Sequence, residues 1–239
     1  MEQPLLSVII PTRNEEDNIS KCLDALTHQK YAKPYEIIVV DTNSTDKTTA
    51  IAKSFKAKVI SENKKGKIYA FIKGANAAKG DILCFTEADC IVPPHWLSTI
   101  TTYFQKNPTV TAISGTYLFY ASTTHLNILA KMCFAVSKWV FKIMYGNDSL
   151  RASNFAIRKN AYKKAGGFSN KYFELYDVEL GLRVGTSGTI HHVDTMEIQT
   201  SDRRFRGRIF KYIGEFLPSF VANILLRKPL KTQTYQDIR

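Results

Sequence analysis

Short apolar runs alternate along the chain with segments in which apolar residues recur every three or four positions. The runs are typical of buried strands and fall at 5–10, 36–40, 58–60 and 81–85. The periodic segments predict helices at 18–26, 43–55, 68–78 and 94–104, and Thr12 or Asn14 is expected to cap the first of them. Strands that alternate with helices favour βαβ units. The pattern therefore predicts an α/β fold with a mainly parallel sheet flanked by helices.

The alternation loosens after residue 107. The remaining pattern predicts a strand at 110–114, an amphipathic segment at 126–145, a stretch at 154–158, a helix ending at 165, a turn at 166–167 and a strand at 189–193. Neither an internal repeat nor a linker is evident. We expect a single domain over 1–200, with halves 1–107 and 108–200, followed by a basic amphipathic C-terminal tail at 201–239.

Polar, acidic segments follow three of the predicted strands. They are Pro11–Glu15 after the first strand, Asp41–Asp46 after the second and Thr86–Asp89 after the fourth. In an open parallel sheet, ligands bind outside the carboxyl ends of the strands. We therefore expect the three acidic loops to meet on one rim of the sheet.

The usual phosphate-binding loops are missing, because the sequence has neither G-x-G-x-x-G after the first strand nor G-x-x-x-x-G-K-[ST]. Acidic residues hold a phosphate only through a divalent cation. Glu87 and Asp89 are two positions apart, so an extended backbone would turn both side chains to one side. This pair suggests Mg or Mn bridging a diphosphate, with a solvated loop as the alternative.

The composition narrows the classes of partner. The chain has 239 residues, and the 44% of them that are hydrophobic exclude a disordered protein. Its net charge of +12 points to nucleic acid, an anionic membrane or a polyphosphate substrate as the partner. The basic residues are dispersed and no nucleic-acid motif appears, so no nucleic-acid partner is expected. The four cysteines are scattered, and with neither a signal peptide nor a membrane span evident, we expect a cytoplasmic protein.

Two segments, 126–145 and 209–226, combine an apolar stripe with lysine or arginine. A basic amphipathic helix of this kind suits the surface of an anionic membrane. We therefore expect peripheral attachment to the inner face of the membrane. The alternative is that both stripes pack on the sheet, as most amphipathic helices do.

Six segments, in order, resemble the motifs of family 2 glycosyltransferases of the GT-A fold: 7–15, 37–46, 66–81, 87–89, 154–168 and 177–183. The resemblance implies an inverting enzyme that moves a sugar from a nucleoside diphosphate sugar to an unknown acceptor hydroxyl, on a lipid-linked or polysaccharide acceptor. It also implies that 1–107 binds the nucleotide and 108–200 faces the acceptor.

The resemblance further implies roles for individual residues. By this resemblance, Pro11, Arg13 and Glu15 line the nucleoside pocket, and Asp41 accepts a hydrogen bond from the base, commonly uracil. Lys67 lies near the base or the diphosphate, and Glu87 faces the ribose or the metal. Asp89 ligates the metal, and Asp177 is the catalytic base. Two positions depart from the family pattern: Glu87 is one methylene longer than the usual Asp, and Tyr176 replaces the Glu before Asp177.

Several assignments stay open at the level of the sequence. Arg203 or Arg204 would neutralise the diphosphate, or both belong to a basic surface cluster. His191 or His192 would supply a third metal ligand, or both are packing residues. The alternatives to the enzyme are an inactive nucleotide-sugar-binding relative, a nucleotidyltransferase and a basic nucleic-acid-binding protein.

Overall fold

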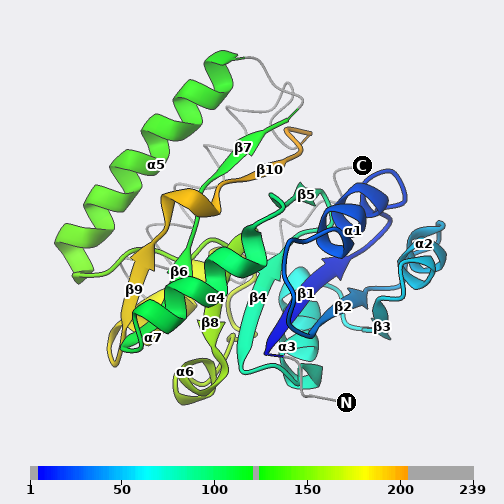
Figure 1. Ribbon diagram of the computed structural model, residues 1–239, viewed down its shortest axis with the longest axis horizontal. Coiled ribbons are helices and arrows are strands. Elements are labelled where there is room, and N and C mark those ends of the chain that lie inside the picture. The colour runs from blue at the N-terminus through cyan, green and yellow to red at the C-terminus, as the bar shows by residue number, and fades with distance from the viewer. Residues whose placement is uncertain (1–4, 121–123, 204–239) are drawn as a thin grey trace.

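The computed structural model describes residues 5–120 and 124–203, and Figure 1 shows its elements. The first half contributes four parallel strands in the order β3-β2-β1-β4. Their bounds are β1 Leu6–Thr12, β2 Tyr35–Asp41, β3 Lys58–Ser61 and β4 Ile82–Thr86. The strands predicted from the apolar runs are therefore present, within one or two residues at each end.

The second half extends this sheet to seven strands, in the order β3-β2-β1-β4-β8-β6-β9. Strand β8 (Asn154–Arg158) is antiparallel to both β4 and β6 (Val110–Ser114), whereas β9 (Thr189–His192) is parallel to β6. A separate sheet joins β5 (Cys90–Ile91), β10 (Ile198–Thr200) and β7 (Tyr117–Phe119). These three strands are only two or three residues long, so they have no periodicity to detect.

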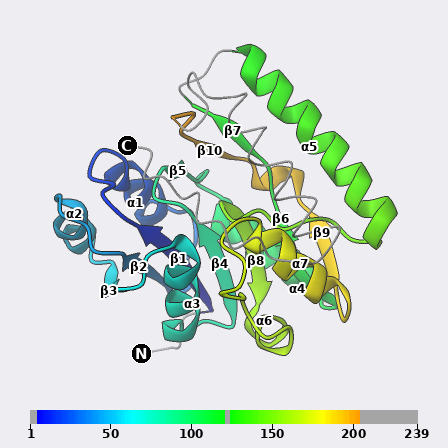
Figure 2. The same ribbon diagram turned by 180° about the vertical axis from the view of Figure 1, so that it is seen from behind.

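Helices cover both faces of the large sheet (Figures 1 and 2). They are α1 Ile19–Thr27, α2 Thr48–Ser54, α3 Lys67–Ala77, α4 Trp96–Lys106, α5 Thr124–Tyr145, α6 Lys159–Lys164 and α7 Tyr176–Gly185, with a 3-10 turn, η1, at Asp194–Met196. The α/β fold with a mainly parallel, helix-flanked sheet is confirmed. In the described parts of the chain, no helix has the combination of length and apolarity that crossing a bilayer requires.

The apolar runs of β1 and β4 are continuous because these strands are buried on both faces, whereas the edge strand β3 is half-buried or exposed. Val8 and Ile10 of β1 pack with α1 and α4 on one side of the sheet. Ile9 lies between them and packs on the other side, with α3 and α7. Successive side chains of a strand point to opposite faces, so one run of β1 serves two cores.

Two predicted helix starts are wrong. The cap of α1 is Asn18, not Thr12 or Asn14. The Thr12 hydroxyl instead donates to Asp41, and Asn14 has a φ of 52° in the loop after β1. Helix α2 begins at Thr48 rather than near Asn43, because an Asp46 carboxylate oxygen accepts the Thr48 backbone N–H at 2.9 Å.

A buried amide links the two sheets. The Asn154 side chain, at the start of β8, accepts a hydrogen bond from Trp96 Nε1 at 2.9 Å. It also donates to the carbonyl oxygens of Thr116, at 2.8 Å, and Met196. Trp96 opens α4, whereas Thr116 and Met196 precede the strands β7 and β10 of the small sheet. One side chain therefore joins three segments that are distant in sequence.

Gly74 lets α3 approach β1 closely. A Cβ atom at this position would lie 2.4 Å from Ile9 Cγ2 and 3.1 Å from Val40 Cγ2. We therefore expect Gly74→Ala to lower the free energy of unfolding by about 1–3 kcal/mol, although alanine is the better helix former. Urea denaturation measures this change.

A double-mutant cycle provides the control for this prediction. Ile9→Ala removes the group that the new methyl would meet, so Gly74→Ala should be neutral or stabilising in that background. An equal loss of stability in both backgrounds would show that the close approach to Ile9 is not the cause.

Candidate functional site

The loops after β1 and β2 are fastened to each other. The backbone N–H of Thr42 donates to the Thr12 carbonyl at 2.8 Å, and that of Asn14 donates to Ser44 Oγ, also at 2.8 Å. One residue further, the N–H of Glu15 donates to Thr48 Oγ1 at 2.7 Å. The polar segments predicted to meet at the carboxyl ends of these strands therefore do so.

Asp41 is a buried carboxylate at the end of β2. Its Oδ1 accepts hydrogen bonds from the hydroxyls of Thr12 and Ser44, and its Oδ2 accepts the Ser44 backbone N–H at 3.0 Å. A carboxylate has about four acceptor positions. Three are used within the protein, which fixes the orientation of the group and leaves one position for a donor on a ligand.

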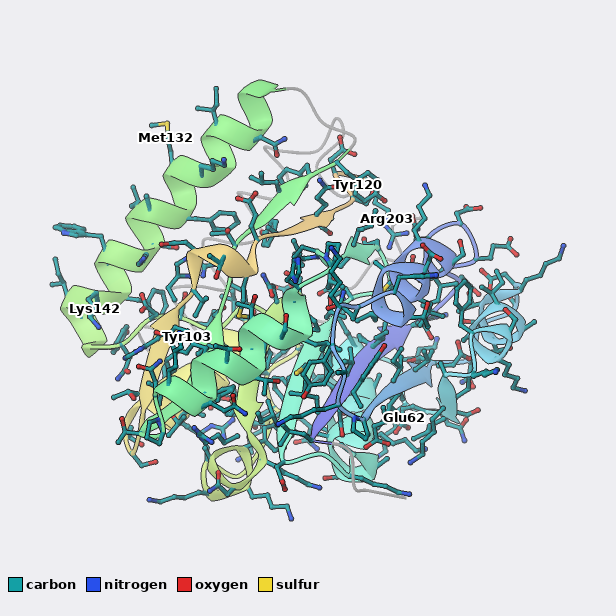
Figure 3. All side chains as sticks on the ribbon, viewed as in Figure 1. Glu62, Tyr103, Tyr120, Met132, Lys142 and Arg203 are labelled. Atoms are coloured by element: carbon teal, nitrogen blue, oxygen red, sulfur yellow. The ribbon has the colours of Figure 1, made fainter. Side chains whose placement is uncertain are left out.

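Glu15 and Asp89 converge on a single cation. Arg203 Nη2 donates to Glu15 Oε1 and also lies 3.1 Å from Asp89 Oδ2. Only 5% of the Asp89 side chain is exposed. Figure 3 shows Arg203 beside α1, on the side of the molecule where β1 ends. The two carboxylates come from different strand-end loops, so this is a place where the fold gathers negative charge around one positive group.

Glu87 and Asp89 do not share one side of an extended strand, and this prediction is wrong. Strand β4 ends at Thr86, and residues 88–89 form a turn in which the Cys90 N–H donates to the Glu87 carbonyl at 3.1 Å. The Glu87 carboxylate instead lies 2.9 Å from Nζ of Lys67, the first residue of α3. Glu87 and Asp89 are therefore held by different cations.

Asp177 lies in the first turn of α7, and its Oδ2 accepts the Ala152 backbone N–H at 2.7 Å. Burial raises the pKa of Asp177, and the negative charge of Glu87 raises it further, whereas the backbone N–H groups lower it. The hydrogen bond from Ala152 fixes the orientation of this carboxylate.

The rest of the motif after Asp177 has a structural role. Glu179 and Arg183 form a bidentate ion pair, with N···O distances of 2.6 and 2.7 Å. Arg183 Nη1 also donates to the Ala165 carbonyl beyond α6. These contacts anchor the helix that carries Asp177.

Arg151 is a residue that the sequence analysis missed. Its Nη2 lies 3.3 Å from Ser137 Oγ on α5, and its guanidinium carbon lies 4.8 Å from the centre of the Phe134 ring. Burial lowers its pKa, while the charges of Asp177 and Asp148 act in the opposite direction. Arg151 belongs to a loop without periodicity, so no pattern signalled its position near the carboxylate of Asp177.

Other predicted residues lie elsewhere or outside the described region. His191 Nδ1 is 2.8 Å from the Tyr103 hydroxyl, and His192 Nε2 is 3.1 Å from Asp194. Among the described residues, no three His, Cys, Asp or Glu side chains form a group suited to a metal. Pro11 belongs to β1 and Arg13 to the loop after it, whereas Arg204 and the segment 209–226 lie outside the described residues.

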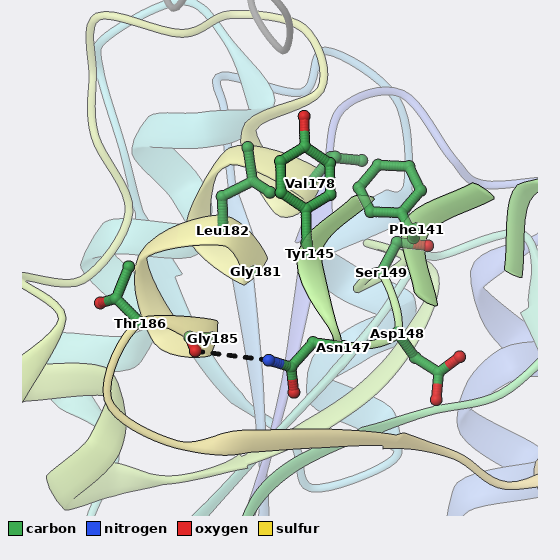
Figure 4. Close-up of a pocket in the computed structure, with 10 residues that line it drawn as sticks. All are labelled: Phe141, Tyr145, Asn147, Asp148, Ser149, Val178, Gly181, Leu182, Gly185 and Thr186. Atoms are coloured by element: carbon green, nitrogen blue, oxygen red, sulfur yellow. Dashed lines mark hydrogen bonds between the residues drawn. The ribbon is translucent and has the colours of Figure 1, made fainter. Parts of the chain in front are cut away.

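A small hollow of about 170 Å³ lies between the end of α5 and α7 (Figure 4). It is lined by Phe141, Tyr145, Val178 and Leu182, and near its edge Asn147 Nδ2 donates to the Gly185 carbonyl at 3.3 Å. Its lining includes Val178, Gly181 and Leu182 of the α7 motif, but none of the residues predicted to bind the nucleotide or the metal. We therefore do not assign this hollow as the binding site of the nucleoside diphosphate sugar.

The raised pKa of Asp177 predicts a pH-dependent cost to stability. An acid whose pKa is higher in the folded than in the unfolded state loses stability as the pH rises above its unfolded pKa, about 3.9. Asp177→Asn keeps an acceptor for the Ala152 N–H and removes the buried charge. We expect it to be more stable than wild type at pH 7, with a smaller difference near pH 4.

Urea denaturation of both proteins between pH 4 and pH 7 measures this difference. If the stability difference does not change with pH, then folding does not raise the pKa of Asp177.

Comparison with known proteins identifies the family of this chain. The profile described as glycosyl transferase family 2 matches residues 7–169. The chain is 31% identical over 188 residues to a dolichyl N-acetyl-alpha-D-glucosaminyl phosphate 3-beta-D-2,3-diacetamido-2,3-dideoxy-beta-D-glucuronosyltransferase of Methanococcus voltae, covering 73% of this chain and 53% of that one. It is 31% identical over 208 residues to the probable glycosyltransferase YdaM of Bacillus subtilis, covering 78% and 48%. The chain thus spans about half the length of these two relatives.

Two solved structures share the fold. A mannosyltransferase from Pyrobaculum calidifontis, in complex with GDP-Man and Mn²⁺, has a TM-score of 0.69 at 21% identity, covering 89% of this chain and 63% of that one. Glucosyl-3-phosphoglycerate synthase from Mycobacterium tuberculosis, in complex with Mn²⁺, UDP and glucosyl-3-phosphoglycerate, has a TM-score of 0.66 at 22% identity, covering 96% and 82%. The family resemblance and the GT-A-type fold are confirmed, and the chain belongs to glycosyl transferase family 2.

Proposed function

We propose that this chain is an inverting glycosyltransferase that moves a sugar from a nucleoside diphosphate sugar, UDP-linked, to an acceptor hydroxyl. The observation that carries the proposal is the gathering of carboxylates from the loops after β1 and β4, where Glu15 and Asp89 converge on Arg203 and Glu87 pairs with Lys67. Asp177, a partly buried carboxylate at the start of α7, is held by the Ala152 N–H. The names of the relatives, which are glycosyltransferases, support the same class of reaction.

The nucleoside end of the donor would lie over the fastened loops after β1 and β2. Pro11, Arg13 and Glu15 border this region, and the free acceptor position of Asp41 suits an N–H on a base such as uracil. The comparisons include both a GDP-Man and a UDP complex of other proteins, so both nucleotides should be tested.

The carboxylates of Glu15 and Asp89 fit a divalent cation, Mg or Mn. They already converge on one positive group, Arg203 Nη2, which acts as a stand-in for the ion. Mg²⁺ is commonly held by one or two carboxylates, with substrate phosphates and water completing its coordination. Asp89 would be the principal ligand, and the role of Glu87 as a second ligand stays a prediction because its carboxylate is paired with Lys67. A bound cation would stabilise the departing diphosphate as a Lewis acid.

Arg203 and Lys67 provide further positive charge at the place assigned to the diphosphate. The planar guanidinium of Arg203 matches phosphate oxygens with two parallel N–H groups. With the donor and its cation bound, the cation would neutralise the charge of Asp89 in place of Arg203. Arg203 is then available to the phosphate, as the sequence analysis predicted for Arg203 or Arg204.

Asp177 would act as the general base. As the acceptor oxygen bonds to the anomeric carbon, the bond from that carbon to the diphosphate oxygen breaks on the opposite face, and the hydroxyl proton passes to the Asp177 carboxylate. The contact from the Ala152 N–H fixes the orientation of this carboxylate. Its raised pKa makes its carboxylate a stronger base than that of an exposed aspartate.

A second candidate is an inactive relative that binds a nucleotide sugar without transferring it. The observation in its favour is the ion pair between Glu87 and Lys67, in which the first acid of the motif is already neutralised. This reading predicts nucleotide binding without donor hydrolysis or transfer, whichever acceptor is offered.

Removing the base should separate chemistry from binding. We expect Asp177→Asn to lower transfer or donor hydrolysis at least about 100-fold, since general base catalysis contributes about 10²–10⁴-fold. Its affinity for UDP or GDP, measured by calorimetry, should change less than about threefold. Wild-type turnover by the variant would exclude Asp177 as the base, and a loss of nucleotide binding would indicate a structural role instead.

The cation site has its own test, which needs no acceptor. Thermal unfolding with UDP or GDP, with and without Mn²⁺, should show an increase in Tm from Mn²⁺ in wild type. Asp89→Asn should abolish this increase, whereas Glu197→Gln, at an exposed carboxylate, should retain it. If Asp89→Asn keeps the full Mn²⁺ effect, Asp89 does not bind the cation.

A further inference from the structure

Helix α5 exposes a row of large apolar side chains. The exposed fractions are 51% for Ile128, 61% for Met132, 61% for Val136, 66% for Trp139 and 64% for Ile143. The helix lies at one edge of the molecule in both views, and Met132 projects away from the body (Figures 1, 2 and 3). We call these five residues the outer stripe. Contiguous exposed apolar surface of this kind marks an interaction site.

The outer stripe occupies one side of the helix. At 3.6 residues per turn its five positions fall within an arc of about 80°. The opposite side attaches α5 to the protein: Phe141 is buried, and the Phe134 ring packs edge-to-face on Tyr117 at 4.7 Å between centroids. The outer stripe therefore faces away from the side of α5 that packs on the protein. Packing on that side does not explain why these exposed side chains are apolar.

The charged residues of α5 itself are all lysines. Lys131, Lys138 and Lys142 are exposed and, at the same helical spacing, fall together on one flank of the stripe. The sequence of α5 contains no Asp or Glu, although Lys138 Nζ comes within 4.0 Å of Asp194 on the neighbouring turn. The chain as a whole carries a net charge of +12. A partner of this surface should be apolar at its centre and negative at its margin.

We propose that α5 is an interfacial helix that docks the protein on an anionic lipid bilayer. The outer stripe enters the boundary between headgroups and acyl chains, and the three lysines contact lipid phosphates. This arrangement is typical of helices that lie in the plane of a membrane surface. A second copy of this chain fits less well, because pairing two outer stripes would bring lysine flanks together with no acid on α5 to neutralise them.

Docking in this way also orients the candidate site, an inference that rests on the proposed function. The inner side of α5 contacts Arg151 through Ser137 and Phe134, and the backbone N–H of the next residue, Ala152, donates to Asp177. The carboxylate assigned as the base is thus linked to α5 through residues 151 and 152. An acceptor hydroxyl carried on a membrane lipid would be within reach of that position.

Vesicle co-sedimentation tests the surface without requiring activity. Wild type is mixed at low salt with phosphatidylcholine vesicles, with or without phosphatidylglycerol. We expect at least tenfold stronger binding to the anionic vesicles, and a loss of at least tenfold in the triple variant Met132→Ser, Val136→Ser, Trp139→Ser. These side chains are exposed, so the variant should fold, as circular dichroism would verify.

A charge-matched control separates α5 from the net charge. Changing Lys131, Lys138 and Lys142 to Glu should also reduce binding at least tenfold. The same change at Lys47, Lys53 and Lys56, exposed residues on or beside α2 at the other edge of the molecule, should reduce it less than threefold. Equal losses in both triple variants would overturn the assignment to α5.

Trp139 offers a direct probe of insertion. The only other tryptophan, Trp96, is fully buried. Anionic vesicles should therefore shift the fluorescence emission to the blue in wild type, and Trp139→Phe should bind as well without the shift. The proposal fails if wild type does not bind at low salt, or if the outer-stripe variant binds as wild type does. It also fails if the outer stripe proves to mediate a dimer or a complex with a protein partner.

Discussion

The candidate site depends on the neutralisation of carboxylates gathered at one edge of a parallel sheet. Glu15, Glu87 and Asp89 come from two strand-end loops, and their mutual repulsion in a partly buried region would oppose folding. Arg203 and Lys67 offset that repulsion, the first by contacting Glu15 and Asp89 together and the second by pairing with Glu87. An acidic cluster that is neutralised by side-chain cations can exchange such a cation for one brought by a ligand.

Asp177 is the exception within this arrangement. It receives backbone hydrogen bonds, but burial and the charge of Glu87 still raise its pKa. The helix that carries it is anchored by Arg183, which binds both Glu179 and the Ala165 carbonyl. A well-anchored helix thus holds a carboxyl group whose pKa is raised, and perturbed pKa values of this kind cluster at functional sites.

The sequence predicts the first half of the fold well and the site only in part. Continuous apolar runs such as 5–10 identify strands buried on both faces, and the order of motifs identifies the family before any coordinates. The pairing of Arg203 with Glu15 spans 188 positions, and no local pattern contains it. Glu87 and Asp89 pair with different cations because a turn replaces the extended backbone that their spacing suggested. Arg151, in an irregular loop, has no periodicity by which to be noticed.

The hydrogen bonds of the Asn154 side chain have a consequence for how the protein unfolds on heating. Because it binds Trp96 and the carbonyls of Thr116 and Met196, the small sheet is joined to the core of the large one through a buried polar junction. Losing any one of these partners would leave a buried amide group unsatisfied, at a cost of about 1–3 kcal/mol. The two sheets should therefore melt in a single cooperative transition.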